Sequence, residues 1–344
     1  MRCSIAFSTE SCGGSEGQRR RRLFRPISEK VEKIIITGAS GFVGRHLVSA
    51  LMDIDGFDVQ AVAHRSNWEA SPKSPRLRIH RRDLSRPNCW EGLIEPGCQL
   101  VNLAHFRHLT SADNIRIMQG LTEACGRIGV KRLIHCSSAV IVGKVRDDII
   151  TEDTRCRPVT SYEKTKWSIE NLLLQRPRHD RETVILRPTA VFGTGGRNLV
   201  GLIGDLMSRS RFYNYLKSCL YHRRAMNLVA VNTLVEVIAF FVKSPRAFDR
   251  EVFIVSDDEC PQNNFRGVEL QLMAGLKIPD YRLKRVGCPP QVLAALLRLT
   301  GRSNTNPQRR YSCDKLLRLG FRKRTSFGAA LAAYARTYAR PEFN

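Results

Sequence analysis

Ile34-Ile35-Ile36-Thr37-Gly38-Ala39-Ser40-Gly41-Phe42-Val43-Gly44 is the stretch that decides the fold of this 344-residue chain. Its β-branched run predicts a buried strand, its G-x-x-G-x-x-G spacing predicts a tight turn, and the amphipathic residues 45–52 predict a helix. Backbone N–H groups in such a turn can approach a pyrophosphate, whose negative charge the helix dipole favours. The stretch therefore predicts a dinucleotide-binding unit; a glycine-rich loop without a ligand is the alternative.

Strand-like and helix-like segments alternate beyond this unit. Strands are predicted over residues 33–37, 58–63, 76–79, 100–103, 132–136 and 183–186. Helices are predicted between them, notably over residues 45–52, 114–127 and 162–175. This alternation implies right-handed βαβ crossovers, and hence an α/β fold with a doubly wound parallel sheet. Ligands of such sheets bind at the carboxyl ends of the strands, where we expect the motifs below to meet.

The chain also divides into predicted regions. Residues 1–30 are rich in Ser, Gly and Arg, which predicts a disordered leader. Residues 31–190 predict the dinucleotide-binding domain, and we expect residues 226–255 to rejoin its sheet. Residues 191–225 and 256–340 predict a smaller substrate-binding lobe, because the periodic pattern there is looser and interrupted by prolines.

Composition excludes several classes of protein. No run of about eighteen apolar residues predicts a membrane span. The eleven cysteines form no C-x-x-C pair, which argues against a metal site or a disulfide framework and favours a reducing, cytoplasmic compartment. The net charge of +24 could attract anionic small molecules or nucleic acid. Because the charge is spread along the chain, we expect a solvated basic surface and no nucleic-acid partner.

The end of the second predicted strand, Val62-Ala63-His64-Arg65-Ser66, bears on the choice of dinucleotide. An acidic residue there would hold the ribose 2′-hydroxyl of NAD, and the stretch has none. The guanidinium of Arg65 suits a 2′-phosphate, which favours NADP(H) and leaves NAD(H) open. The alternative is an arginine that stacks on the adenine without discriminating. Asp83 and Leu84 follow the third strand and suit an adenine contact, with a plain surface aspartate as the alternative.

Two further motifs supply parts for hydride transfer. Ser137 and Ser138 end a buried strand, and Tyr162 and Lys166 lie four residues apart on one helix face. A phenol with a pKa near 10 is a poor acid–base group at neutral pH, and we expect the Lys166 ammonium to lower the pKa of Tyr162. A serine hydroxyl can polarise a substrate carbonyl, so the set predicts an oxidoreductase. An exposed tyrosine beside a solvated lysine is the alternative.

These motifs resemble the extended short-chain dehydrogenase/reductase family, in its NAD-dependent epimerase/dehydratase branch that acts on nucleotide sugars. The resemblance runs from about Lys33 to Tyr334 and is specific over residues 37–44, 137–143, 162–166 and 186–188. It implies a Rossmann domain with a C-terminal substrate lobe. It also implies a homodimer, formed through two helices that pack as a four-helix bundle.

The resemblance implies roles for individual residues. Catalysis would fall to Ser138, Tyr162, Lys166 and Asn114. Besides Arg65, Asp83 and Leu84, the cofactor would contact Gly38, Ser40, Gly41, Phe42, Val43, Gly44, Leu103, Ala104, Tyr162, Lys166 and Pro188. The substrate would contact Ser138, Asn198 and, on a less certain local match, Arg224.

Departures from the family pattern narrow the range of reactions that we expect the chain to catalyse. Residues 138–142 contain no acid, whereas the family's dehydratases carry an Asp-Glu pair there, so 4,6-dehydratase activity is disfavoured. A 4-keto-sugar reductase that uses NADPH is favoured by Arg65, and a nucleotide-sugar 4-epimerase with bound NAD is the close alternative. Relatives acting on a non-sugar carbonyl form a third option. A non-catalytic redox sensor or RNA-binding relative comes from another class, and the intact Ser138, Tyr162 and Lys166 argue against it.

Overall fold

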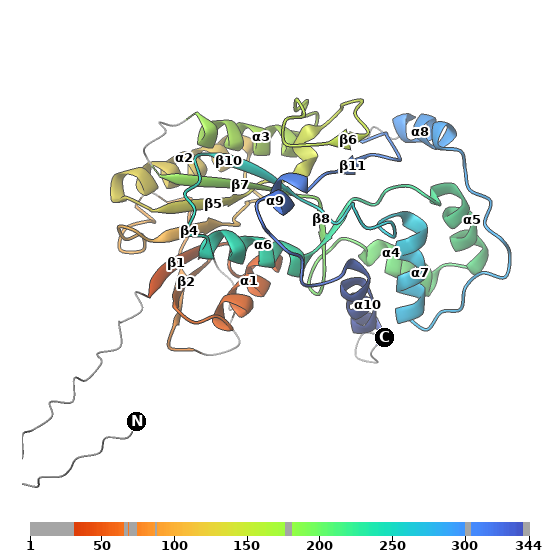
Figure 1. The fold of residues 1–344 in the computed structure, drawn as a ribbon, viewed down its shortest axis with the longest axis horizontal. Coiled ribbons are helices and arrows are strands. Elements are labelled where there is room, and N and C mark those ends of the chain that lie inside the picture. Colours follow the sequence, from red (N-terminus) through yellow and green to blue (C-terminus); the bar gives the residue numbers. More distant parts are fainter. Residues whose placement is uncertain are drawn as a thin grey trace, which may run out of the picture. The chain divides into compact units, whose positions relative to one another are not determined.

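A computed structural model of the chain describes residues 31–64, 68, 74–86, 88–175, 181–299 and 304–339. Seven parallel strands form its central sheet, in the order β10-β7-β5-β4-β1-β2-β3 (Figure 1). The strands are β1 (Glu32–Thr37), β2 (Phe57–Ala63), β3 (Leu77–Arg81), β4 (Gln99–Asn102), β5 (Arg132–Cys136), β7 (Glu182–Pro188) and β10 (Glu251–Val255). The predicted doubly wound parallel sheet is confirmed.

Helices cover both faces of this sheet. Side chains along β1 alternate between the faces, so Ile34 and Ile36 enter one core and Ile35 enters the other. The first core is closed by α1 (Phe42–Met52) and α6 (Val231–Lys243). The second core is closed by α2 (Ser111–Ile128) and α3 (Ser161–Leu174), on the opposite side of the sheet in Figure 1. The continuous apolar run of β1 therefore reflects burial on both faces.

The chain after β7 contributes to more than one sheet. β10 pairs with β7 in the central sheet. β9 (Leu228–Ala230) instead pairs with β8 (Ala190–Phe192) in a two-stranded sheet. A second two-stranded sheet joins β6 (Ile149–Ile150) to β11 (Arg310–Tyr311).

Further helices belong to the second half of the chain. They are α4 (Val200–Ser208), α5 (Arg211–Tyr221), α7 (Phe265–Gly275), α8 (Pro290–Leu299), α9 (Asp314–Arg318) and α10 (Phe327–Tyr338). Apolar residues of α4, α7 and α10 pack with β8 and β9 in a core of their own. A substrate lobe with the limits 191–225 and 256–340 stays a prediction, as does the leader over residues 1–30, which lies outside the described residues.

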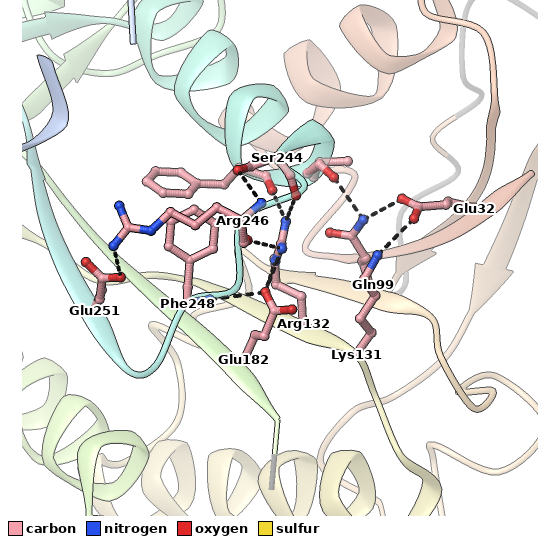
Figure 2. A network of polar contacts seen from close by, with 11 residues as sticks. Glu32, Gln99, Lys131, Arg132, Glu182, Ser244, Arg246, Phe248 and Glu251 are labelled. Carbon is pink, nitrogen blue, oxygen red and sulfur yellow. Dashed lines mark hydrogen bonds and ion pairs between the residues drawn. The ribbon is translucent and has the colours of Figure 1, made fainter. Parts of the chain in front are cut away.

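The amino-terminal edge of the sheet is held by a buried arginine. Arg132, at the start of β5, is 1% exposed, and its guanidinium lies 2.6 Å from Glu182 Oε2 (Figure 2). The same guanidinium donates to the carbonyl oxygens of Phe241, Ser244 and Arg246, at the end of α6. One side chain thus ties two strands of the sheet to the helix that covers them.

Candidate active site

Two glycines allow the turn after β1 to close. Gly38 has φ +69°, and a Cβ there would lie 3.0 Å from the backbone nitrogen of Ala104 and from the carbonyl carbon of Leu103. A Cβ on Gly44 would overlap the carbonyl oxygen of Gly38 and lie 2.7 Å from the Cα of Ala39. Because these two residues have no Cβ, α1 and the segment after β4 can pack directly against the backbone of the turn.

The start of α1 fits an anionic group. Its N-cap residue, Gly41, offers no side-chain cap, and its first turn contains no acid. The N–H groups at a helix start need partners, and the helix dipole favours a negative charge there. The backbones of Phe42, Val43 and Gly44 could therefore hold the diphosphate of a dinucleotide. The carbonyl oxygen of Ser40 is bound by Arg45 Nε at 2.8 Å.

A second glycine-rich segment, residues 193–196, lies over the start of α1. Thr194 O accepts from His46 Nε2 at 2.9 Å, and a Cβ on Gly196 would lie 2.7 Å from the ring of Phe42. The ring of Phe42 also meets His46 edge to face. The side chain of Phe42 therefore packs against this segment, while its backbone belongs to the helix start. Pro188 is buried at the end of β7, and its predicted cofactor contact stays a prediction.

Substituting Gly44 by alanine is expected to lower the free energy of unfolding by about 1–3 kcal/mol, because the added methyl group must displace backbone atoms. Gly120→Ala in α2 is the matched control. A Cβ there meets nothing within 4 Å, so the change should raise stability by about 0.5–1 kcal/mol. Urea unfolding measures both, and equal effects would contradict the tight turn.

The predicted adenine and phosphate contacts lie at the ends of β2 and β3. Arg65 is outside the described residues. Its neighbour His64 places Nε2 3.4 Å from Asp83 Oδ1. Asp83 also accepts from Ser85 N at 3.0 Å and from Ser85 Oγ at 2.6 Å, and these bonds lower its pKa to about 2. Leu84 is buried in the core. The adenine-binding roles of Asp83 and Leu84 stay predictions.

Ser138 and Tyr162 meet at the carboxyl end of β5. Ser138 directly precedes a 3₁₀ helix, η1 (Ala139–Val142). A capping box fixes the start of α3, because Thr160 Oγ1 accepts from Glu163 N and the Glu163 carboxylate accepts from Thr160 N. Tyr162 lies in that first turn, with its phenol close enough to the Ser138 hydroxyl for this neighbour to act to lower the pKa of the phenol.

Lys166 lies one turn further along α3. It is 3% exposed, and its Nζ donates to Cys136 O at 3.0 Å. Burial lowers its pKa. Although 42% of Tyr162 is exposed, its pKa is raised, chiefly by burial, while the neighbouring Ser138 acts to lower it. The expectation that Lys166 lowers the pKa of Tyr162 is therefore wrong in this structure, because burial of the phenol outweighs favourable contacts and the ammonium is directed at a backbone carbonyl.

His105 is a site residue that the sequence analysis missed. Its ring meets that of Tyr162 edge to face, with the centroids 5.1 Å apart. Burial, followed by the charges of Lys166 and Arg107, lowers the pKa of His105 to about 4, so the ring is neutral at pH 7. Its position directly after Ala104, at the end of the segment that follows β4, was the available signal.

Residues 103–105 connect the two halves of the site. Gly38 packs against the backbone of Leu103 and Ala104, and the next residue, His105, packs against Tyr162. Tyr162 in turn lies close to Ser138. The structure therefore brings the glycine turn and the Ser138–Tyr162 pair to the same edge of the sheet, as expected for parallel strands.

Asn114 secures the loop that follows His105. Its Nδ2 donates to Phe106 O at 2.9 Å and to Thr110 O at 3.0 Å, and its Oδ1 accepts from Phe106 N at 3.1 Å. The side chain is buried within α2. These contacts give Asn114 a positioning role, and the predicted catalytic role stays a prediction.

The two predicted substrate residues lie in the second half of the chain. Asn198 Nδ2 donates to Val191 O in β8 at 2.7 Å, and the Tyr334 hydroxyl donates to Asn198 O at 3.3 Å. The guanidinium of Arg224 lies 5.4 Å from the ring centroid of Tyr221, at the end of α5. Substrate contacts for both residues stay predictions.

A cavity of about 850 Å³ lies among β6, β11 and the segments joining α5 to β9 and β10 to α7. Four basic or imidazole side chains line it: His222, Arg223, Arg266 and Arg310. Asp148 and Asp258 line it too, and burial raises the pKa of Asp258 to about 6. The sequence analysis missed this set, because its members come from separate segments with no shared motif. The cavity suits an anionic ligand.

Acid is expected to destabilise the fold through two histidines. His135 is 1% exposed, and its Nδ1 lies 3.0 Å from Asn102 Nδ2. Burial lowers the pKa of His135 and of His105 below 6.5, so the unfolded chain takes up protons first. Stability is therefore full above about pH 6.5 and falls toward pH 4, by about 1.4 kcal/mol per pH unit for each proton. Urea unfolding across this range should show a shallower slope for His105→Asn; a flat wild-type profile would contradict the assignment.

Among the described residues, no helix is long and apolar enough to cross a membrane, and no three or more His, Cys, Asp or Glu residues are grouped so that they could hold a metal ion. The nine described cysteines form no disulfide with one another.

Comparisons with known proteins agree with this geometry. Residues 34–253 match the model of the NAD dependent epimerase/dehydratase family. The chain is 28% identical over 189 residues to the sterol-4-alpha-carboxylate 3-dehydrogenase of Saccharomyces cerevisiae, covering 50% of this chain and 54% of the relative. It is 27% identical over 246 residues to a UDP-glucose 4-epimerase of Vibrio cholerae, covering 66% and 71%. The match thus spans about half the length of the yeast relative.

Solved structures show the same fold. A UDP-N-acetylglucosamine 4-epimerase of Methanobrevibacter ruminantium aligns with a TM-score of 0.68 at 19% identity, over 90% of this chain and 98% of the other. A dTDP-glucose 4,6-dehydratase of Bacillus anthracis, in complex with NAD, aligns with a TM-score of 0.67 at 14% identity, over 90% and 97%.

Proposed function

The chain belongs to the NAD-dependent epimerase/dehydratase family, and on this premise we propose that it is an NAD(P)-dependent oxidoreductase acting at a carbonyl or secondary alcohol. This family is the one that the glycine motif and the Tyr162–Lys166 motif resembled in the sequence. One observation carries the proposal: residues 103–105 contact both the glycine turn and Tyr162, so a dinucleotide held at the turn can reach the Ser138–Tyr162 pair.

The side chains divide the proton chemistry between them. A bound nicotinamide dinucleotide supplies or accepts the hydride. The Ser138 hydroxyl would hydrogen-bond the substrate oxygen, and the Tyr162 phenol would give it a proton or take one away. Because the pKa of Tyr162 is raised, its phenol is protonated at neutral pH. This state suits proton donation to a carbonyl oxygen.

We propose a nucleotide-diphosphate sugar as substrate, with 4-keto reduction as the reaction. The basic cavity lined by His222, Arg223, Arg266 and Arg310 supports a phosphate-bearing ligand. The acid-free stretch 138–142 disfavours elimination of water. The close alternative is a 4-epimerase that retains NAD. Cytoplasmic location and homodimerisation through α2 and α3 remain part of this proposal.

A second candidate substrate is an apolar 3-hydroxy compound. The 28% identity to a sterol-4-alpha-carboxylate 3-dehydrogenase favours it. Ser138, Tyr162 and Lys166 would play the same parts, with oxidation in place of reduction.

Arg65 is expected to select NADP(H). Replacing it with alanine should weaken NADPH binding by about 1–3 kcal/mol, through the loss of a charge-assisted bond to the 2′-phosphate, and should affect NADH little. Titration calorimetry with both dinucleotides measures the difference. Equal weakening of both would show that Arg65 does not recognise the phosphate, and would favour NAD.

Isotope transfer tests the reaction. The purified chain is incubated with UDP- or dTDP-4-keto-hexoses and NADPH carrying deuterium at either face of C4. In parallel, it is incubated with UDP- or dTDP-hexoses, or with sterol alcohols, in the presence of NAD⁺. A reductase places deuterium on sugar C4 and releases one NADP⁺ per product. Inversion at C4 without net dinucleotide consumption would establish the epimerase, and turnover of sterol alcohols alone would establish the second candidate. RNA binding unaffected by Tyr162→Phe, with no turnover, would favour the non-catalytic class.

A further inference from the structure

The surface formed by α5, α8 and the segment between α7 and α8 departs from the pattern of a soluble protein. It comprises residues 209–223 and 277–299, called here the apolar–basic face. Eight of the sixteen exposed large apolar side chains among the described residues lie in these two segments, although they make up only a small part of the chain. A concentration of this kind marks an interaction surface.

Helix α5 turns its apolar side outward. Its buried residues are Asn214 and Ser218, whereas Phe212 is 67% exposed and Leu216 is 50% exposed. The inward polar residues are hydrogen-bonded, because Asn214 Nδ2 donates to Asp205 O at 2.8 Å and the Ser218 hydroxyl donates to the Glu269 carboxylate. Asn214 Oδ1 is buried without a partner among the described residues. The orientation of α5 is therefore fixed by hydrogen bonds, and it leaves Phe212 and Leu216, one turn apart, on a common outer side.

The segment after α7 extends this surface. Pro279 O accepts from Arg211 at 2.6 Å, Lys284 O accepts from the Tyr215 hydroxyl at 3.0 Å, and Cys288 N donates to Cys219 O at 3.0 Å. The segment thus runs beside α5 and continues into α8, as Figure 1 shows at the right of the view. It adds two highly exposed side chains, Leu283 at 65% and Val286 at 77%.

Helix α8 adds a second element with exposed apolar side chains. Leu293 and Leu297 are buried, while Val292, Leu296 and Leu299 are exposed. Both sides of this helix are therefore apolar, and among the described residues only one of them is covered.

The charge of the face indicates what covers it. Residues 209–223 and 277–299 contain nine Lys or Arg residues and one acid, Asp280. Three of the nine are in ion pairs, Arg209 and Lys217 with Asp205 and the buried Arg285 with Asp280 and Glu269, so the face remains basic through the other six. Exposed aliphatic and aromatic side chains among basic residues are typical of helices that lie in the interface of an anionic lipid bilayer. A second copy of this chain would bring two such basic surfaces together, which like-charge repulsion disfavours.

We propose that the apolar–basic face docks the protein onto an anionic lipid surface, with Phe212, Leu216, Leu283 and Val286 entering the headgroup region. The basic residues around them would contact lipid phosphates. Such docking is peripheral and needs no membrane-spanning helix. It is independent of which substrate the active site takes.

Vesicle co-sedimentation of the full chain tests this. Wild-type protein should bind phosphatidylcholine vesicles containing about one-third phosphatidylserine, and binding should weaken with salt and be far lower on pure phosphatidylcholine. Phe212→Glu/Leu216→Glu should reduce binding about tenfold or more, because it places charge in the apolar stripe. Val31→Glu, at an exposed apolar residue before β1, is the matched control and should bind as wild type does.

Circular dichroism melting confirms that both variants fold, and NADPH titration separates this test from the active-site proposal. Equal vesicle binding by wild type and the double variant would overturn the assignment. So would equal binding to neutral and anionic vesicles. Self-association that the double variant abolishes, without vesicle binding, would assign the face to a second copy of the chain instead.

Discussion

Replacing Tyr162 with phenylalanine is expected to lower kcat by about 10²–10⁴-fold and to leave dinucleotide affinity unchanged. The substitution removes only the hydroxyl that lies near Ser138, and it keeps the ring that packs against His105. Turnover is measured with the substrate identified by isotope transfer, and affinity by calorimetry with NADPH. Both measurements are needed, because a fall in kcat together with a fall in dinucleotide affinity would indicate a disturbed site and not a missing proton donor.

Tyr213→Phe provides the matched control for this experiment. Tyr213 lies on α5 and is 47% exposed, so loss of its hydroxyl should change neither kcat nor affinity. If the Tyr162 variant retained wild-type turnover, the phenol would not be the acid–base group. Ser138 and His105 would then be the groups to examine next.

Replacing Arg132 with methionine is expected to lower the free energy of unfolding by about 3–5 kcal/mol. Methionine approximates the length of the side chain but leaves Glu182 without its ion pair. It also removes the donors for the carbonyl oxygens of Phe241, Ser244 and Arg246. Figure 2 shows Ser244, Arg246 and Glu182 around the guanidinium. Urea unfolding followed by circular dichroism gives the difference.

Arg246→Ala tests whether burial is the reason for so large an effect. The Arg246 side chain is 51% exposed and pairs with Glu251 at 2.9 Å at the margin of the same network (Figure 2). An exposed pair of this kind should contribute no more than about 1 kcal/mol. A similar loss in both variants would show that the Arg132 network is not the principal tie between the sheet and α6.

The fold was largely predictable because its signals are local. The run Ile34–Ile36 and the glycines after it specify strand, turn and helix within eleven residues, and the structure has them as β1, the turn and α1. The paired motif of Tyr162 and Lys166 likewise lies on one helix, α3. Patterns of this kind depend on spacing along the chain, which a sequence shows directly.

Other features depend on contacts between distant segments. His105 can be recognised as a site residue only because α3 places Tyr162 against it in the folded chain. The basic cavity joins residues near 223, 266 and 310, which no spacing rule connects. Helix α5 could not be oriented from its sequence, since an amphipathic pattern normally buries its apolar side and this helix buries Asn214 and Ser218. The pKa of Tyr162 depends on burial, which the Tyr-x-x-x-Lys spacing does not convey.

Calorimetric titration of the whole purified chain with NADPH and with NAD⁺ is the most direct test of the central claim, that the glycine turn holds a dinucleotide beside Tyr162. We predict saturable binding of one dinucleotide per chain, retained by Tyr162→Phe and weakened by Gly44→Ala at a temperature where that variant is folded. Failure of the wild-type chain to bind either dinucleotide would contradict the account.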